Sequence, residues 1–304
     1  MALICKMKLL QYAILISSIW IHASCQPTQN DSKTAQISIE DGLGRKVLIP
    51  SKPLKILGLS PAVTEMLFFI LPDSNVAGVT FNCNYPPEKV ALKQKINTYP
   101  LDIESILAMK PDLIFSEEGI TSLSDASQLE KVGFPVCIFK YRKTRDILNA
   151  MDSIWKWCPH SAFSLAKINF LRTTLDALEK RSSSMNEKDR PKMLAITWLD
   201  PIFAFGAETW LSDIMRLAGG RNCLETVLDK PYPSLQRETV LKLNPDILYG
   251  GNFEKMDSTF FTMYPELKSI PAYKNKKVYE LNDDLASRPG PRFLESVNNL
   301  EKFK

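Results

Sequence analysis

The stretch ESILAMKPDLIF, residues 104–115, returns 134 residues later as ETVLKLNPDILY, residues 238–249. Both copies share a glutamate, a hydroxyl residue, apolar residues at helical spacing, Pro-Asp, two aliphatic residues and an aromatic. Each copy predicts a helix that stops at the proline and is followed by a strand, because proline cannot continue a helix. Convergence of common helix-to-strand sequences is the alternative. Twelve positions in register favour two structurally related halves.

Strand-like runs alternate with helical patterns around both copies of the repeat. In the first half the strand-like runs are 54–60, 75–80, 112–116 and 135–140, with helical patterns at 64–71 and 103–110. In the second half they are 192–198, 246–251 and 277–281, with helical patterns at 209–220 and 237–244. Such alternation is typical of parallel sheets. We therefore expect an α/β fold with two Rossmann-like lobes, each with a central, mainly parallel sheet.

One long helical pattern lies between the two halves, at about residues 161–183. At 1.5 Å per residue, about 22 helical residues span roughly 33 Å, so one helix can carry the chain from lobe to lobe. We expect an amino-terminal lobe at 37–158, a linking helix at 159–185 and a carboxy-terminal lobe at 186–304. The expected apolar stripe of this helix consists of Phe163, Ala166, Phe170, Leu171, Leu175 and Leu178.

The amino terminus has the pattern of an export signal. Two lysines precede an apolar run from Leu9 to Ile21, which is too short to span a membrane, and two small residues precede Cys25. We expect residues 1–24 to be a lipoprotein signal peptide and 25–36 a flexible tether. A lipidated Cys25 would anchor the exported protein in the periplasm or at the cell surface. Ordinary cleavage nearby, which releases a free protein, is the alternative.

Composition and charge exclude several classes of protein. The chain is 45% hydrophobic and 24% charged, as in ordinary globular proteins. The net charge of +4 falls to +2 when Lys6 and Lys8 leave with the signal peptide, which argues against a nucleic-acid partner. Beyond residue 24 the one histidine is His160, at a helix junction where a surface or capping role is usual. The sequence contains no GxSxG, HExxH or phosphate-binding motif.

These observations make an enzyme, such as an exported hydrolase, the weaker hypothesis. We expect no metal site and no resident cofactor. The sequence does not determine whether any disulfide joins the four cysteines beyond residue 25, which are Cys83, Cys137, Cys158 and Cys223.

Aromatic residues next to prolines occur in four loops that lie at strand ends or helix starts. Ligands of parallel α/β sheets bind beyond the carboxyl ends of the strands, where we place these loops. Proline restricts the loop backbone, so each ring is held in place. For any one ring, packing against its own lobe is the alternative. As a set they predict an inter-lobe cleft that binds a flat or bulky ligand by apolar contact: Tyr85, Tyr99, Phe203 and Tyr232.

Two glutamates begin the two repeat helices, Glu104 and Glu238. A carboxylate at a helix start is stabilised by the helix dipole, and this explanation suffices for stability. Because the same position recurs in both halves, we also expect the pair to dock onto paired arginines of a two-subunit partner.

Five segments resemble, in the same order, motifs of the periplasmic binding proteins of cobalamin and iron-siderophore ABC importers. The segments are LSPAVTE (59–65), NYPPE (84–88), LDIESILAMKPDLIF (101–115), KPYPSLQRETVLKLNPDIL (230–248) and SRPGPR (287–292). The first marks the superfamily, and the two tyrosine-proline loops favour the cobalamin-binding members. The resemblance implies two lobes joined by one helix, a ligand in the cleft and modest lobe closure. It further implies a corrinoid as transported ligand and, as partner, a homodimeric ABC permease with its ATPase subunits.

The resemblance also implies roles for individual residues. Ligand contacts fall on Tyr85, Tyr99 and Tyr232, on Trp198 or Phe203, and on Asp284, whereas permease arginines would meet Glu104 and Glu238. Tyrosine stands at 99 and 232 where the family has tryptophan, and Asn84 stands where aspartate is common.

Two arginines make an anionic ligand the alternative to a corrinoid. Arg288, which we include among the ligand-binding residues, and Arg292 would pair well with the carboxylates or catecholates of haem or a ferric siderophore.

Overall fold

The structure, a computed structural model, describes residues 35–225 and 230–303. The predicted signal peptide and the lipidation site at Cys25 lie outside these residues. The chain first forms an antiparallel hairpin of β1 (Gln36–Glu40) and β2 (Lys46–Pro50). Gln36, predicted to end the tether, is therefore the first residue of a strand.

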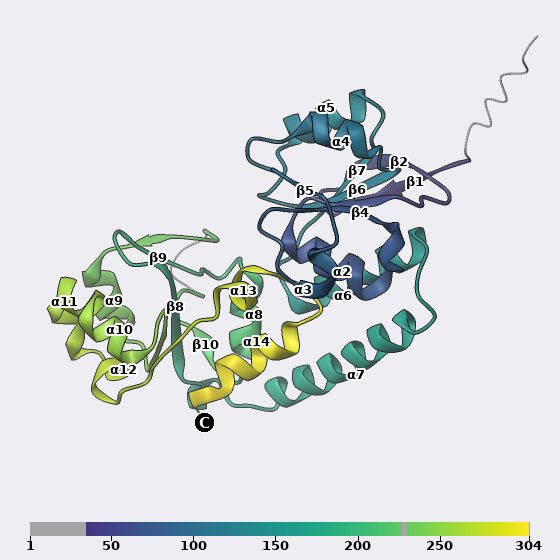
Figure 1. The fold of residues 1–304 in the computed structure, drawn as a ribbon. Coiled ribbons are helices and arrows are strands. Elements are labelled where there is room, and N and C mark those ends of the chain that lie inside the picture. The colour runs from purple at the N-terminus through teal and green to yellow at the C-terminus, as the bar shows by residue number, and fades with distance from the viewer. Residues whose placement is uncertain (1–34, 226–229, 304) are drawn as a thin grey trace, which may run out of the picture. The chain divides into compact units, whose positions relative to one another are not determined.

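The first central sheet contains five parallel strands in the order β5–β4–β3–β6–β7 (Figure 1). The strands are β3 (Ile56–Gly58), β4 (Val76–Thr80), β5 (Lys95–Ile96), β6 (Leu113–Glu117) and β7 (Val136–Phe139). Their helices are α2 (Pro61–Ile70), α3 (Pro87–Val90), α4 (Ile103–Met109), α5 (Leu123–Lys131) and α6 (Thr144–Trp157), with a 3₁₀ turn at Asp73–Asn75.

The second sheet is mixed, with the order β11–β9–β8–β12–β13 and β10 also paired to β8. The strands are β8 (Lys192–Trp198), β9 (Ile202–Ala204), β10 (Arg221–Asn222), β11 (Ser234–Leu235), β12 (Ile247–Tyr249) and β13 (Val278–Tyr279). Strands β8, β10, β12 and β13 are parallel to one another. Strand β9 runs antiparallel to both of its neighbours, β8 and β11. Phe203, predicted to lie in a loop, is therefore in the middle of β9.

The helices of the second half surround this sheet. They are α8 (Trp210–Leu217), α9 (Arg237–Leu243), α10 (Phe253–Ser258), α11 (Phe260–Met263), α12 (Pro271–Lys274), α13 (Asp283–Ser287) and α14 (Phe293–Leu300). Short 3₁₀ turns occur at Glu187–Asp189, Pro265–Ser269 and Glu301–Phe303.

The two copies of the sequence repeat have the same local structure. Helices α4 and α9 both end in a left-handed residue, Lys110 and Asn244, with φ 50° and ψ 61° in each case. The aspartate of each Pro-Asp then accepts a hydrogen bond from the backbone at the start of the neighbouring strand. Asp112 accepts from Lys55 N at 2.9 Å, and Asp246 accepts from Lys192 N at 2.8 Å.

A single helix, α7 (Ser164–Ser183), connects the two sheets in sequence, and it packs against α2, α6 and α8 (Figure 1). It is shorter at both ends than the predicted 159–185. The predicted stripe is partly wrong, because Phe163 and Phe170 are 74% and 64% exposed. The buried positions of α7 are Ser164, Ile168, Leu171, Leu175 and Ser182.

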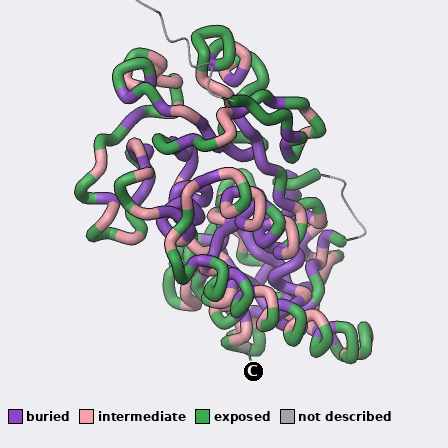
Figure 2. Tube along the Cα trace, turned by 90° about the vertical axis from the view of Figure 1, so that its right-hand side faces the viewer, coloured by how far each residue is buried: buried purple, intermediate pink, exposed green. Residues whose placement is uncertain are grey.

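The apolar core has three clusters, and the largest is shared by both halves. Alternate strand residues belong to different clusters, because side chains of a strand point to opposite faces. Cys137 and Met193, from the two sheets, join the shared cluster with residues of α2, α6, α7, α8 and α14. Val136 belongs to an outer cluster of the first half and Leu194 to an outer cluster of the second. Figure 2 shows the buried stretches inside the trace and the exposed ones along its periphery.

Candidate functional site

A cavity of about 390 Å³ is lined by residues of both halves of the chain. From the first half come Glu117–Ile120 and Tyr141–Arg142, at the carboxyl ends of β6 and β7. From the second half come Glu208–Trp210, which lead into α8, together with Pro231, Tyr232, Ser287 and Pro289. We refer to this space as the inter-lobe cavity. Its position fits the general rule that ligands bind beyond the carboxyl ends of parallel strands.

A larger cavity, of about 620 Å³, lies elsewhere. It is lined by the β1–β2 hairpin and by Pro111, Asp112 and Pro135, which precede β6 and β7. It is therefore at the amino-terminal edge of the first sheet, where ligand sites of α/β folds do not form. We take the smaller, inter-lobe cavity as the candidate site.

Among the five predicted aromatic residues, Tyr232 lines the inter-lobe cavity. Its ring packs edge-on against Phe205, with 5.6 Å between centroids. Burial raises the pKa of its hydroxyl, and the nearby Glu117 raises it further.

The other four predicted aromatic residues are not among the residues that line this cavity. Tyr99 is 97% exposed, and Trp198 is 63% exposed with its indole Nε1 donating to Asp200 O at 2.8 Å. Phe203 is half-buried and pairs with Ser234 of β11. Tyr85 packs against the guanidinium of Arg292. Ligand contact by these four residues stays a prediction.

Arg288 ties the loop after β4 to the segment between α13 and α14. It donates to Asn84 Oδ1 and to Asn82 O (3.2 Å), and its Nη2 lies 2.6 Å from Asp284 Oδ1. Asn84 in turn donates to Asp284 Oδ2 at 2.9 Å. Three residues singled out in the sequence, Asn84, Asp284 and Arg288, thus form one cluster across the two halves.

Arg292 makes a bidentate ion pair with Glu65 of α2. Its Nε and Nη2 lie 2.7 and 2.6 Å from the two carboxylate oxygens, and Glu65 is only 3% exposed. Arg288 Nη1 approaches the same carboxylate at 3.5 Å. The Arg292 guanidinium also lies 4.2 Å from the centroid of the Tyr85 ring, a cation–π contact. Both arginines that suggested an anionic ligand are therefore engaged by carboxylates of the chain itself.

Glu117, which sequence reasoning missed, is buried at the end of β6 and lines the inter-lobe cavity. Burial raises the pKa of its carboxyl to about 7, and a hydrogen bond with the Ser60 hydroxyl opposes this rise. Burial raises the pKa of the Tyr141 hydroxyl, and the nearby carboxyl of Glu117 raises it further. Within residues 35–225 and 230–303, no lysine or arginine forms an ion pair with Glu117.

One arginine bridges the two halves at the rim of the inter-lobe cavity. Arg142 Nη2 lies 2.5 Å from Glu118 of the first half, and its Nε lies 3.4 Å from Glu208 of the second. Lys140 also pairs with Glu118, at 3.5 Å. In the part of the chain that the structure describes, the cation that lines the cavity is thus matched by two carboxylates.

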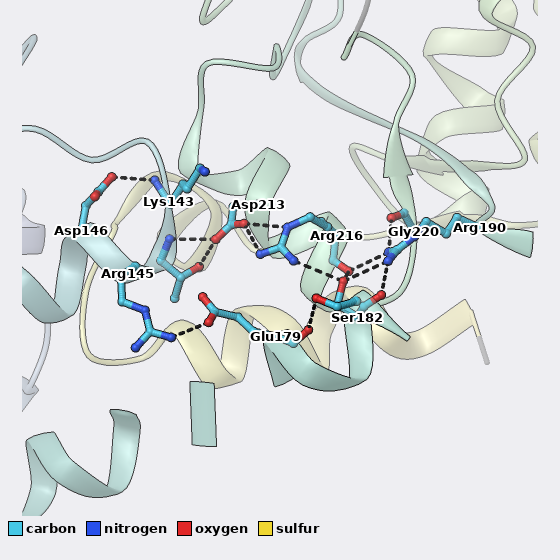
Figure 3. A network of polar contacts seen from close by, with 11 residues as sticks. Lys143, Arg145, Asp146, Glu179, Ser182, Arg190, Asp213, Arg216 and Gly220 are labelled. Atoms are coloured by element: carbon cyan, nitrogen blue, oxygen red, sulfur yellow. Dashed lines mark hydrogen bonds and ion pairs between the residues drawn. The ribbon is translucent and has the colours of Figure 1, made fainter. Parts of the chain in front are cut away.

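A polar network connects α6, α7 and α8 (Figure 3). The buried Asp213 accepts from the backbone N and the hydroxyl of Thr144, both at 2.8 Å, and pairs with Arg216 at 2.6 Å. Arg216 and Arg190 reach Ser182 of α7. The network joins α6 of the first half to α8 of the second.

Glu104 and Glu238 are both exposed, at equivalent positions of α4 and α9. Helix α4 is capped by Asp102, which accepts from Ser105 N at 2.9 Å, so Glu104 is not needed as the cap. Glu238 pairs with the adjacent Arg237 at 3.1 Å.

The remaining sequence features have no part in this site. The four described cysteines are free thiols, and His160 stacks on Trp155 with 4.3 Å between rings. In the described part of the chain, histidine, cysteine and acidic residues form no group of three that could hold a metal ion. The helices described there are all too short or too polar to span a bilayer.

The chain belongs to the periplasmic binding protein family, whose profile matches residues 56–285. It is 24% identical over 299 residues to an ABC transporter substrate-binding lipoprotein of Bacillus subtilis, covering 95% of this chain and 94% of the relative. It is 23% identical over 246 residues to a vitamin B12-binding protein of Vibrio vulnificus, covering 81% and 88%. The chain is therefore a periplasmic binding protein of the ABC-importer family, which consists of substrate-binding proteins rather than enzymes.

Solved structures confirm the predicted fold class of two α/β lobes. The periplasmic vitamin B12-binding protein of Vibrio cholerae has a TM-score of 0.70 and 22% identity, and the match covers 83% of this chain and 96% of that one. A periplasmic haem-binding protein of Roseiflexus has a TM-score of 0.64 and 20% identity, with 81% and 96% covered. At these identities the likeness concerns the fold alone.

Proposed function

We propose that the protein captures cobalamin, or a related corrinoid, between its lobes and delivers it to the permease of an ABC importer. The inter-lobe cavity carries this proposal, because residues of both halves line it, those of the first half at the carboxyl ends of β6 and β7. At about 390 Å³ the cavity is smaller than a corrinoid. We therefore propose that the cavity holds one edge of the corrin ring with its amide side chains. The rest of the ligand lies in the cleft outside the cavity, where exposed aromatic rings can contact it.

Because Arg288 and Arg292 already form ion pairs within the chain, a corrinoid is favoured over an anionic ligand. Arg292 is bound by the buried Glu65, and Arg288 by Asp284 and by Asn84. A haem propionate or a catecholate would have to break these contacts to recruit either guanidinium, whereas the neutral amides of a corrinoid need no free cation. The similarity to vitamin B12-binding proteins supports the same choice.

Haem or a ferric siderophore is the second candidate ligand. The similarity of fold to a haem-binding protein favours it, as does the presence of two arginines beside the loop that carries Tyr85. We propose no resident cofactor for either case, because the ligand is cargo.

A titration of the purified protein with cyanocobalamin, haemin and a ferric siderophore tests the proposal. We expect saturable binding of cyanocobalamin at micromolar concentration or below, and weaker binding of the two anionic ligands. Absence of saturable cyanocobalamin binding at that concentration would contradict the proposal, and tight binding of haemin in its place would establish the second candidate.

We further propose that Glu104 and Glu238 dock onto arginines of a homodimeric permease, which works with its ATPase subunits. Their exposure at equivalent positions of the two repeats supports this role. The double variant Glu104→Ala, Glu238→Ala should retain its affinity for cyanocobalamin but lose most corrinoid uptake in cells. A loss of ligand affinity in the purified double variant would assign the glutamates to folding or ligand binding.

We propose that the protein is exported and anchored in a membrane by lipid at Cys25. The lipoprotein name of the Bacillus relative supports the anchor. Metabolic labelling with a fatty-acid analogue should mark the wild-type protein and leave Cys25→Ala unmarked and released from the membrane fraction.

A further inference from the structure

The group that stands out in the inter-lobe cavity is the carboxyl of Glu117. Its side chain lies where β6 ends, is 9% exposed, and belongs to the cavity lining. Buried carboxylates normally have a cationic partner, since an isolated buried charge is costly. Its polar partner here is the Ser60 hydroxyl. A buried carboxyl that faces a cavity, and whose partner among the described residues is a hydroxyl, is suited to a ligand that completes its hydrogen bonds.

The charges around Glu117 determine which ligand that is. From the first half the cavity is lined by Glu118, Tyr141 and Arg142, and from the second by Glu208 and Tyr232. Arg142 is shared between Glu118 and Glu208, so among the described residues the lining contains three carboxyl groups and one cation that is already paired. Arg288 points away, toward Asn84 and Asp284, although its neighbours Ser287 and Pro289 line the cavity. An anionic ligand edge would therefore meet negative charge without a free cation.

We propose that Glu117 is the specificity-determining residue of the inter-lobe cavity. Its neutral carboxyl donates a hydrogen bond to a carbonyl of a neutral, amide-bearing ligand edge. Carboxylate ligands are repelled from the same cavity. This inference rests on the proposed function and deepens it. A ligand that covers the cavity removes the remaining water from the carboxyl, which further disfavours its ionised form. Ligand binding is thus coupled to protonation of Glu117.

The sign of this coupling follows from the position of the carboxyl. Burial already raises its pKa to about 7, so the free protein loses this proton as the pH rises through neutrality. The ligand-bound protein retains the proton to higher pH. Affinity is therefore highest below about pH 7 and falls above it. Tyr141 and Tyr232, whose pKa values are raised by burial, keep their protons throughout this range.

The first test uses the wild-type protein and cyanocobalamin, so it does not depend on the folding of a variant. The dissociation constant should rise roughly tenfold between pH 6 and pH 9, as expected for a shift of about one pKa unit on binding. Calorimetry at pH 7.5, in buffers with different ionisation enthalpies, should show uptake of a fraction of a proton. Zero uptake would overturn the inference.

The second test uses Glu117→Gln, whose side-chain amide keeps the shape and the donor. This variant should bind cyanocobalamin within about threefold of the wild type at pH 6, and its dissociation constant should change less than twofold up to pH 9. Its discrimination against haemin should shrink. The matched control is Glu254→Gln, the same change at an exposed position of α10, which should retain the wild-type pH profile.

The outcomes separate this inference from the proposed function. Binding of cyanocobalamin with the same pH profile in the wild type and in Glu117→Gln overturns the role of Glu117 and leaves the proposed function intact. A wild-type protein that binds no cyanocobalamin at pH 6, or that prefers haemin, overturns the proposed function and this inference together.

Discussion

At the scale of single residues, the ion pair of Glu65 and Arg292 links α2 to the segment before α14 and holds the Tyr85 ring. Arg292→Met removes the bidentate partner of a carboxylate that is 3% exposed and also removes the cation beside Tyr85. We expect a loss of about 3 kcal/mol of unfolding free energy, because a buried carboxylate loses its bidentate partner and keeps only the 3.5 Å contact with Arg288. Urea unfolding measures the loss, and a cyanocobalamin titration should show weaker binding.

The double variant Glu65→Leu, Arg292→Met is the matched control for this prediction. It removes both charges, so it should recover most of the stability that the single variant loses, without restoring the position of Tyr85. Equal stability of the single and double variants would contradict the view that the cost arises from a Glu65 carboxylate that has lost its bidentate partner.

Glu117 also makes the stability of the ligand-free protein depend on pH. Its pKa is about 7 in the folded protein, above the value of 4.5 for an ordinary glutamate, so the folded state holds the proton more tightly. Its contribution is therefore unfavourable once the pH exceeds 4.5, and the penalty grows until about pH 7, where it reaches on the order of 3 kcal/mol. Glu117→Gln should be more stable than the wild type at pH 8 and similar to it at pH 4, as measured by urea unfolding. Equal stability at both pH values would contradict the raised pKa.

Sequence reasoning at this scale found residue types but not their partners. It singled out Arg288 and Arg292 as free cations, because the carboxylates that engage them, Asp284 and Glu65, were not known to face them. It missed Glu117, because a glutamate at the end of the run LIFSE has the same sequence context whether it faces solvent or a cavity. The cavity that Glu117 faces is completed by the second half of the chain, which supplies Tyr232 and Pro231 to its lining.

At the scale of elements, the helix–Pro-Asp–strand repeat was predicted from the sequence and is confirmed by equal dihedral angles at Lys110 and Asn244. A left-handed conformation costs lysine about 1 kcal/mol, whereas asparagine and glycine tolerate it. Lys110→Gly should therefore raise the unfolding free energy by about 0.5 kcal/mol, after allowance for the greater entropy of glycine in the unfolded chain. Urea unfolding measures this gain.

Asn244→Gly is the control, since it makes the equivalent change where the native residue already suits the conformation. It should change stability less than Lys110→Gly does. If Asn244→Gly gained more unfolding free energy than Lys110→Gly, the cost of the left-handed backbone conformation would not explain the difference between the two helix ends.

Elements without a distinctive pattern were those that the sequence did not predict. The β1–β2 hairpin was missed because six of its ten strand residues are exposed, so no continuous buried run marks it. Strand β9 was placed in a loop because Pro201 precedes it and it has only three residues. Both are antiparallel additions next to parallel sheets, and alternation of strands and helices predicts only the parallel strands.

At the scale of the whole described chain, the two lobes share one core. Residues of both sheets pack with α2, α6, α7, α8 and α14 in a single apolar cluster, and only the outer face of each sheet has a cluster of its own. A hinge that opened the lobes widely would expose this shared core to water, at about 25 cal/mol for each square ångström of apolar surface. Ligand binding is therefore expected to bring modest rather than wide closure.

The shared core also predicts that residues 36–303 unfold as one cooperative unit. Asp213 couples the two halves, since it is buried and accepts two hydrogen bonds from Thr144 of the other half. Asp213→Ala leaves the buried Thr144 N–H without a partner, at a cost of about 2–3 kcal/mol. If the halves are coupled, hydrogen exchange of amides in β6 and β12 should accelerate by the same factor.

The control is Arg145→Gln, which breaks exposed ion pairs between α6 and α7 and should cost less than about 1 kcal/mol of unfolding free energy. Acceleration confined to one of the two strands would show that each lobe has its own stability, and the limit on lobe opening would then no longer follow from the core.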